Sequence, residues 1–116
     1  LFDDAGFMDR FTQLRLDLAD HATLYGRFAD LARQGGSLGP EVSIIKIWGM
    51  EAFQRVTEFA LDAAGSYGAA AAAIELEGDR VDLLAPFYMA RLATIGGGSN
   101  EIQRNIVARH VLHLPT

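Results

Sequence analysis

Two long stretches of the chain carry apolar side chains at steps of three and four residues, the spacing that places them on one face of an α-helix. Neither helix could bury its apolar face alone, and residues 35–39 form a short connector, so we expect the two to pack antiparallel. The predicted stripe of residues 3–34 is Phe7, Phe11, Leu14, Leu18, Ala22, Tyr25, Ala29 and Ala32, and that of residues 40–64 is Ile45, Trp48, Ala52, Val56, Phe59 and Ala63.

Glycine and proline mark where these helices end and begin. Gly35 and Gly36 are expected to stop the first helix, because glycine readily adopts the left-handed conformation found after helix ends. Pro40 presets the backbone for the first turn of the second helix, and Glu41 suits the positive end of its dipole. Gly65 is placed to end that helix.

Polar residues near the helices have simple expected roles. Asp3 or Asp4 can accept hydrogen bonds from the first free N–H groups of the first helix. Glu51 precedes Arg55 by four residues, so the two are predicted to pair on the solvent side of the second helix.

The rest of the chain predicts two shorter helices after an irregular segment. Residues 65–83, with five alanines at 69–73, are expected to form a loop or insertion. Pro86 begins or bends a third helix over about 84–95, and a fourth covers about 99–112. No alternation of polarity predicts a strand. The fold class expected for residues 1–116 is a single all-α domain, an up-and-down helical bundle.

Composition excludes several classes of function. The 116 residues contain no cysteine, which excludes disulfides and a thiol nucleophile. The net charge of -5 argues against a nucleic-acid or anionic-membrane surface, and no apolar run is long enough for membrane insertion. We therefore expect a cytoplasmic protein. The chain opens at Leu1 inside an already amphipathic region, so we expect it to be the carboxy-terminal piece of a longer protein.

A run of three glycines before the last predicted helix is the strongest indication of function. Gly96, Gly97 and Gly98 allow backbone to approach a ligand with no Cβ in the way, and the helix that follows offers free N–H groups to an anion. Ser99 can cap this helix or reach a phosphate or ribose oxygen. The pattern predicts the rim of a cofactor site, with a plain helix cap as the simpler alternative.

Residues 95–115 resemble the carboxy-terminal signature of the acyl-CoA dehydrogenase flavoprotein family. The Gly39-Pro40-Glu41 turn with Ser43 and Lys46 is similar to a second stretch of that family, so the resemblance covers nearly the whole chain, with residues 69–79 as a variable insertion. It implies the family's C-terminal helical bundle without its first helix. The signature positions that fit are Ile95, Gly98, residues 101–106, Ala108, Arg109, Leu114 and Pro115.

The resemblance implies an FAD-dependent oxidoreductase that catalyses the α,β-dehydrogenation of acyl-CoA thioesters and passes electrons to an electron-transfer flavoprotein. Ser99, Asn100 and Glu101 then match cofactor-binding positions, and Gly98 matches a glycine whose backbone approaches the acyl thioester. The chain would contribute the FAD rim and an interface of a homo- or hetero-oligomer.

Gly97 departs from the family pattern. Many members carry a glutamate there, the base that removes the α-proton, and a glycine cannot accept a proton. The base could come from the first bundle helix, as in some members, or the chain could belong to a base-less subunit of a heteromeric enzyme. A third interpretation is that the chain belongs to a group of family members that use the same fold for a related reaction. No catalytic residue can be named, and a non-catalytic helical association module is the alternative function.

Three further residues are weaker candidates. Asp62 falls where some family members place a glutamine that reaches the cofactor, but a carboxylate would be repelled by a pyrophosphate, so we expect a solvated charge. His110 and His113 lie three apart, yet no carboxylate at matching spacing completes a ligand set, so no metal site is predicted.

Overall fold

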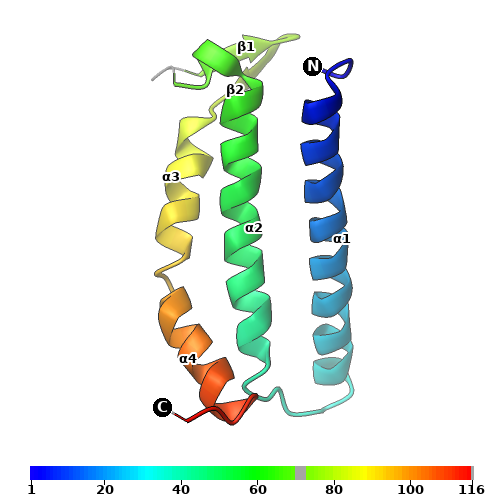
Figure 1. Ribbon diagram of the computed structural model, residues 1–116, viewed down its shortest axis with the longest axis vertical. Helices are drawn as coiled ribbons and strands as arrows, with labels where there is room; N and C mark the ends of the chain where they lie inside the picture. The colour runs from blue at the N-terminus through cyan, green and yellow to red at the C-terminus, as the bar shows by residue number, and fades with distance from the viewer. Residues whose placement is uncertain (70–72, 116) are drawn as a thin grey trace.

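The computed structural model describes residues 1–69 and 73–115. Within them four α-helices form a bundle around α2, Val42–Ala63. Helix α1, Ala5–Arg33, runs antiparallel to α2 on one side. On the other side α3, Leu84–Ala93, and α4, Asn100–His110, follow one another in the direction opposite to α2 (Figure 1). The all-α, up-and-down bundle predicted from the sequence is confirmed.

Local sequence explains where α1 starts and stops. The Asp4 carboxylate accepts a hydrogen bond from the backbone N–H of Phe7 at 2.8 Å, so Asp4 is the N-cap. At the other end Gly35 adopts a φ of +78°, and the N–H of Gly36 bonds to the carbonyl oxygen of Leu31 at 2.9 Å. These bonds satisfy carbonyl groups that the end of a helix leaves open.

The face of α1 that meets α2 follows the predicted stripe only in its first half. Phe7 is buried, and its ring lies 4.8 Å from that of Phe59. Beyond Leu14 the predicted stripe is wrong at most positions, because Leu18 and Tyr25 are 42% and 59% exposed, and of its later members Ala29 is half-buried. Ala22 and Ala32 are exposed as well.

Polar side chains share the contact with apolar ones in the middle of α1. The Trp48 indole donates to Asp17 at 2.7 Å, and His21 Nε2 donates to the carbonyl oxygen of Ile45 at 3.1 Å. The less exposed positions Phe7, Leu14, His21 and Phe28 are seven residues apart, the repeat of two helices that wind around each other. A pattern built only on apolar residues misses this seam.

Residues 65–83 contain regular structure that the sequence pattern did not predict. After a 3₁₀ turn at Gly65–Tyr67, strand β1, Ile74–Leu76, pairs antiparallel with β2, Asp79–Val81. The expectation of no strand is wrong here, because three-residue strands are too short to show an alternating pattern. The turn residues Glu77 and Gly78 have φ of 52° and 90° and form the two-residue connection typical of hairpins. Part of the alanine run, residues 70–72, lies outside the described residues.

The charged side chains of α2 connect the helices on both sides. Glu51 pairs with Arg104 of α4, and Arg55 pairs with Asp17 of α1, so the predicted Glu51–Arg55 pair on the solvent side is wrong. A central helix has neighbours on two sides, and partners from other helices replace the i, i+4 partner. None of the helices in the described part of the chain is long and apolar enough to cross a membrane.

Candidate functional site

The residues between α3 and α4 form a short exposed turn, residues 95–99, here called the glycine loop. Gly97 and Gly98 adopt φ of +68° and +96°, a conformation that L-residues with a Cβ rarely adopt. The loop closes where the backbone N–H of Asn100 donates to the carbonyl oxygen of Thr94 at 3.0 Å. The three glycines are exposed, so bare backbone faces outward.

Some backbone N–H groups of the glycine loop donate hydrogen bonds to other backbone groups, and others do not. The N–H groups of Ile95 and Gly96 donate to the carbonyl oxygen of Leu92, both at 3.0 Å. In the described residues, no backbone hydrogen bond uses the N–H groups of Gly97, Gly98 or Ser99. The open donors therefore lie in the glycine loop.

The first turn of α4 is capped by its own residues. Ser99 is the N-cap, and its hydroxyl oxygen accepts from the N–H of Ile102 at 3.4 Å. The pKa of the exposed Glu101 carboxyl lies below its ordinary value, mainly because its own backbone N–H donates to it and secondarily because the Ser99 hydroxyl does. At neutral pH Glu101 is therefore an ionised group that only accepts hydrogen bonds.

The Asn100 side chain turns inward toward α2. Asn100 is only 4% exposed, and its amide oxygen accepts from Lys46 Nζ at 2.7 Å. Its amide nitrogen donates to Glu51 at 3.3 Å, and the same Glu51 oxygen pairs with Arg104. Of the three predicted cofactor residues, Ser99 belongs to the glycine loop and Glu101 to the first turn of α4, whereas the side chain of Asn100 bonds to α2.

The two central glycines differ in the space around them. A Cβ built at Gly98 would lie 2.8 Å from Nε2 of Gln103, whereas one at Gly97 would meet nothing within 4 Å. At Gly98 the backbone angle disfavours a side chain, and the Gln103 amide, which ends a flexible side chain, would also have to move aside. Gly97 has room for a side chain, but its left-handed backbone disfavours one.

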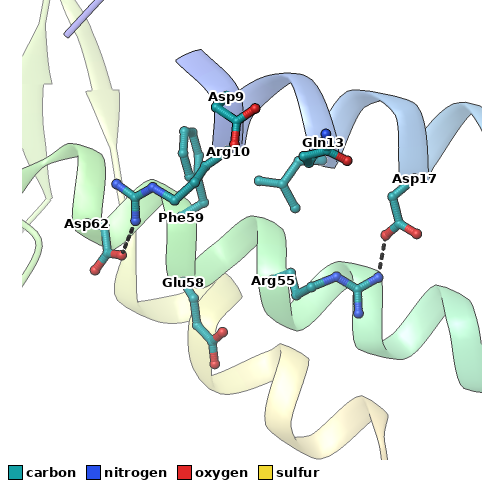
Figure 2. A pocket seen from close by; sticks show the side chains of 9 residues that line it. Asp9, Arg10, Gln13, Asp17, Arg55, Glu58, Phe59 and Asp62 are labelled. Atoms are coloured by element: carbon teal, nitrogen blue, oxygen red, sulfur yellow. Dashed lines mark hydrogen bonds and ion pairs between the residues drawn. The ribbon is translucent and has the colours of Figure 1, made fainter. Parts of the chain in front are cut away.

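A groove of about 470 Å³ between α1 and α2 is a second candidate that sequence patterns did not predict (Figure 2). The helical spacing of Asp9, Gln13 and Asp17 could have indicated its polar side. Its charges largely pair with one another, Arg10 with Asp62 at 3.3 Å and Arg55 with Asp17, so we assign it no ligand.

The electrostatics of this groove support a structural role for Asp17. Burial opposes ionisation of its carboxyl, but hydrogen bonds from Arg55 and Trp48 outweigh burial and hold its pKa below the ordinary value. The carboxylate thereby connects one residue of α1 to two residues of α2.

The remaining sequence candidates lie away from the glycine loop. Asp62 lies on the α1 side of α2, where it pairs with Arg10 (Figure 2). His110 ends α4, and His113 follows it with a φ of 53°. Over residues 1–69 and 73–115, no group of three or more histidine, aspartate or glutamate side chains could hold a metal ion.

Comparison with known proteins gives one match. Residues 1–112 match the sequence model described as the acyl-CoA dehydrogenase C-terminal domain. No curated protein and no solved structure matches the chain. The resemblance seen in residues 95–115 and around Lys46 is thereby confirmed over nearly the whole chain.

Proposed function

Because the chain belongs to the acyl-CoA dehydrogenase family through its C-terminal domain, we propose that it forms one wall of an FAD site. In the complete protein this site would serve the α,β-dehydrogenation of an acyl-CoA thioester. The observation that carries the proposal is the exposed glycine loop, whose N–H groups at Gly97, Gly98 and Ser99 are not used by other backbone groups in the described chain.

The donors and acceptors of the loop suit different parts of the cofactor. Flavin carbonyl oxygens, ring nitrogens and phosphates accept hydrogen bonds, and the open N–H groups donate them. The single O–H of Ser99, which donates to Glu101 in this structure, would have to turn toward the cofactor to donate to it. Ionised Glu101 suits a ribityl or ribose hydroxyl, which donates, and not the pyrophosphate, which would repel it. Asn100 contributes by holding the start of α4, since its side chain faces α2.

Gly98 is the proposed contact for the substrate. Its backbone is exposed and carries no side chain, so a thioester carbonyl can approach the N–H group closely. Bound FAD would supply the hydride acceptor. Gly97 has no group that takes a proton, so the α-proton must be removed by a residue of another segment of the complete protein or of a partner subunit.

The proposed partners follow from the same family. They are an acyl-CoA, an electron-transfer flavoprotein and further subunits of a homo- or hetero-oligomer, in the cytoplasm. Large apolar side chains on α3 and after it support an oligomer, because the large apolar patches of soluble proteins commonly mark contact sites. Those exposed by more than half are Tyr88, Met89, Leu92, Ile95, Ile102, Leu112 and Leu114.

The same exposed apolar side chains favour a second candidate function. A helical association module, either self-associating or acting as the base-less subunit of a heteromer, would bury them without binding FAD. The two functions differ in whether the complete protein contains bound flavin after purification.

The test is the absorption spectrum of the purified complete protein, followed by an assay with acyl-CoA thioesters and an artificial electron acceptor. We expect bound flavin and substrate-dependent bleaching of its visible absorbance. The 116-residue chain alone should bind FAD weakly or not at all, because other domains would cover the rest of the cofactor. A colourless complete protein that takes up no added FAD would contradict the proposal and favour the association module.

A further inference from the structure

We propose that Lys46 is a positioning residue, which holds the glycine loop in the shape that meets the flavin. The inference rests on the proposed function, because it assigns a role in that same site. Lys46 lies on the second turn of α2. Its two hydrogen bonds go to Thr94 and Asn100 and not to residues 95–99 of the glycine loop. Its effect on the cofactor would therefore be indirect.

The geometry places one cation at the neck of the loop, defined as Thr94 and Asn100. Lys46 Nζ donates to the carbonyl oxygen of Thr94 at 3.1 Å and to the side-chain oxygen of Asn100 at 2.7 Å. The backbone N–H of Asn100 donates to the same Thr94 oxygen at 3.0 Å. These three hydrogen bonds form a closed ring that joins the last residue before the loop to the first residue after it.

The chemistry of the neck suits a positive charge. Thr94 follows the end of α3, where the helix dipole leaves partial negative charge on the carbonyl groups. Hydrogen bonds donated by an ammonium group are stronger than those of neutral donors. Asn100 is nearly fully buried, so removing Lys46 would leave its amide oxygen without this partner in a place that water hardly reaches.

The loop itself is held less firmly than its neck. The carbonyl oxygen of Ser99 accepts from the N–H of Gln103 at 3.0 Å, but the side-chain contacts between the loop and α4 are long, at 3.4 Å from Gln103 Nε2 to the carbonyl oxygen of Gly97 and 3.4 Å from the Ile102 N–H to the Ser99 hydroxyl. Glycine gains more conformational freedom than any other residue when it is released. Opening the neck should therefore let Gly97 and Gly98 leave their left-handed conformations, although every proposed flavin contact is still present in the sequence.

The experiment compares Lys46→Met with Lys46→Arg in the complete protein. Methionine keeps an unbranched stem and removes the charge, whereas arginine keeps the charge. The control is Arg91→Met, which removes the ion pair between α3 and Glu58 of α2 but leaves the neck intact. Two quantities are measured for each protein: amide hydrogen exchange over residues 94–101 without flavin, and the dissociation constant for FAD.

We expect Lys46→Met to accelerate exchange at the Asn100 amide and to weaken FAD binding roughly tenfold, the size of one lost charge-assisted hydrogen bond. Lys46→Arg should keep most of the slow exchange at the Asn100 amide and most of the FAD affinity. Arg91→Met should leave loop exchange and FAD affinity unchanged even where it lowers thermal stability. A purely structural role for Lys46 would instead change stability without this selective effect on FAD.

Two results would overturn the inference: unchanged loop exchange in Lys46→Met, or faster exchange with unchanged FAD affinity. If Lys46→Met does not fold, the Lys46→Gln variant, which keeps a neutral donor, is held to the same two criteria. Failure of the proposed function is a separate outcome, because the unsubstituted protein would then bind no FAD. The flavin role of Lys46 would fall with it, while the exchange data would still decide whether Lys46 holds the neck.

Discussion

At the scale of single residues, the sequence predicts the roles of some side chains around the glycine loop and not of others. The cap role of Ser99 follows from its place between a glycine run and an apolar periodic stretch, and its hydroxyl accepts the expected first-turn N–H. The inward turn of Asn100 could not be predicted, because its partners Lys46 and Glu51 lie about fifty residues away in the sequence. Local patterns carry no information on such pairs.

Ser99→Ala should lower both stability and flavin binding. Losing the N-cap of α4 costs about 1 kcal/mol of unfolding free energy, and the same change removes a proposed cofactor donor. Asp4→Ala is the matched control, since it removes the N-cap of α1 far from the glycine loop. Denaturant unfolding and FAD titration of both variants check this. Equal loss of FAD affinity in the two variants would contradict a direct role for Ser99.

At the scale of the elements, the sequence predicted the helices well and their contacts only in part. Steps of three and four among apolar residues are a reliable sign of a helix, but they do not say which face meets a neighbour when polar groups share the contact. His21 and Asp17 of α1 bond to α2, while the apolar Leu18 beside them is exposed. The β1–β2 hairpin was missed because its strands have three residues each.

Gly49 of α2 is expected to be essential for the contact with His21. An alanine Cβ there would lie 2.9 Å from His21 Nε2, so Gly49→Ala should destabilise the fold by about 1–3 kcal/mol. Gly26→Ala in α1, where a Cβ meets nothing within 4 Å, should instead stabilise it by about 0.5–1 kcal/mol. In a His21→Ala background, Gly49→Ala should lose its penalty. Urea unfolding of the four variants measures this coupling, and a penalty that persists without His21 would refute the steric explanation.

Acid should weaken the contact between α1 and α2 through Asp17. Its pKa is lower in the folded state than its ordinary value of 3.8, so its stabilisation is present above that value and is lost as the pH falls through the folded pKa. Asp17→Asn should therefore reduce stability near neutral pH and flatten the stability curve in strong acid. Unfolding free energies measured across the acid range test this. Parallel curves for the two proteins would mean that Asp17 does not contribute to the acid dependence.

At the scale of the whole molecule, helix number and antiparallel order were predictable, because each apolar face demands a partner and the connectors are short. The assembly beyond the chain is less constrained. Leu16, Tyr25 and Leu92 are among many large apolar side chains that stay exposed on the bundle, although the predicted stripe had placed Tyr25 against the second helix. Under the proposed function these side chains would be covered by other segments or subunits of a complete acyl-CoA dehydrogenase, because large exposed apolar surfaces commonly mark contact sites.

The proposed function depends on a contact between the glycine loop and FAD. The most direct measurement is amide hydrogen exchange of the complete protein with and without FAD, resolved over residues 95–102. We expect FAD to protect the amides of Gly97, Gly98 and Ser99, which are not used by other backbone groups in the described chain, while the hairpin amides of residues 74–81 stay unchanged. Flavin binding that leaves the exchange of the loop amides unaltered would contradict the claim.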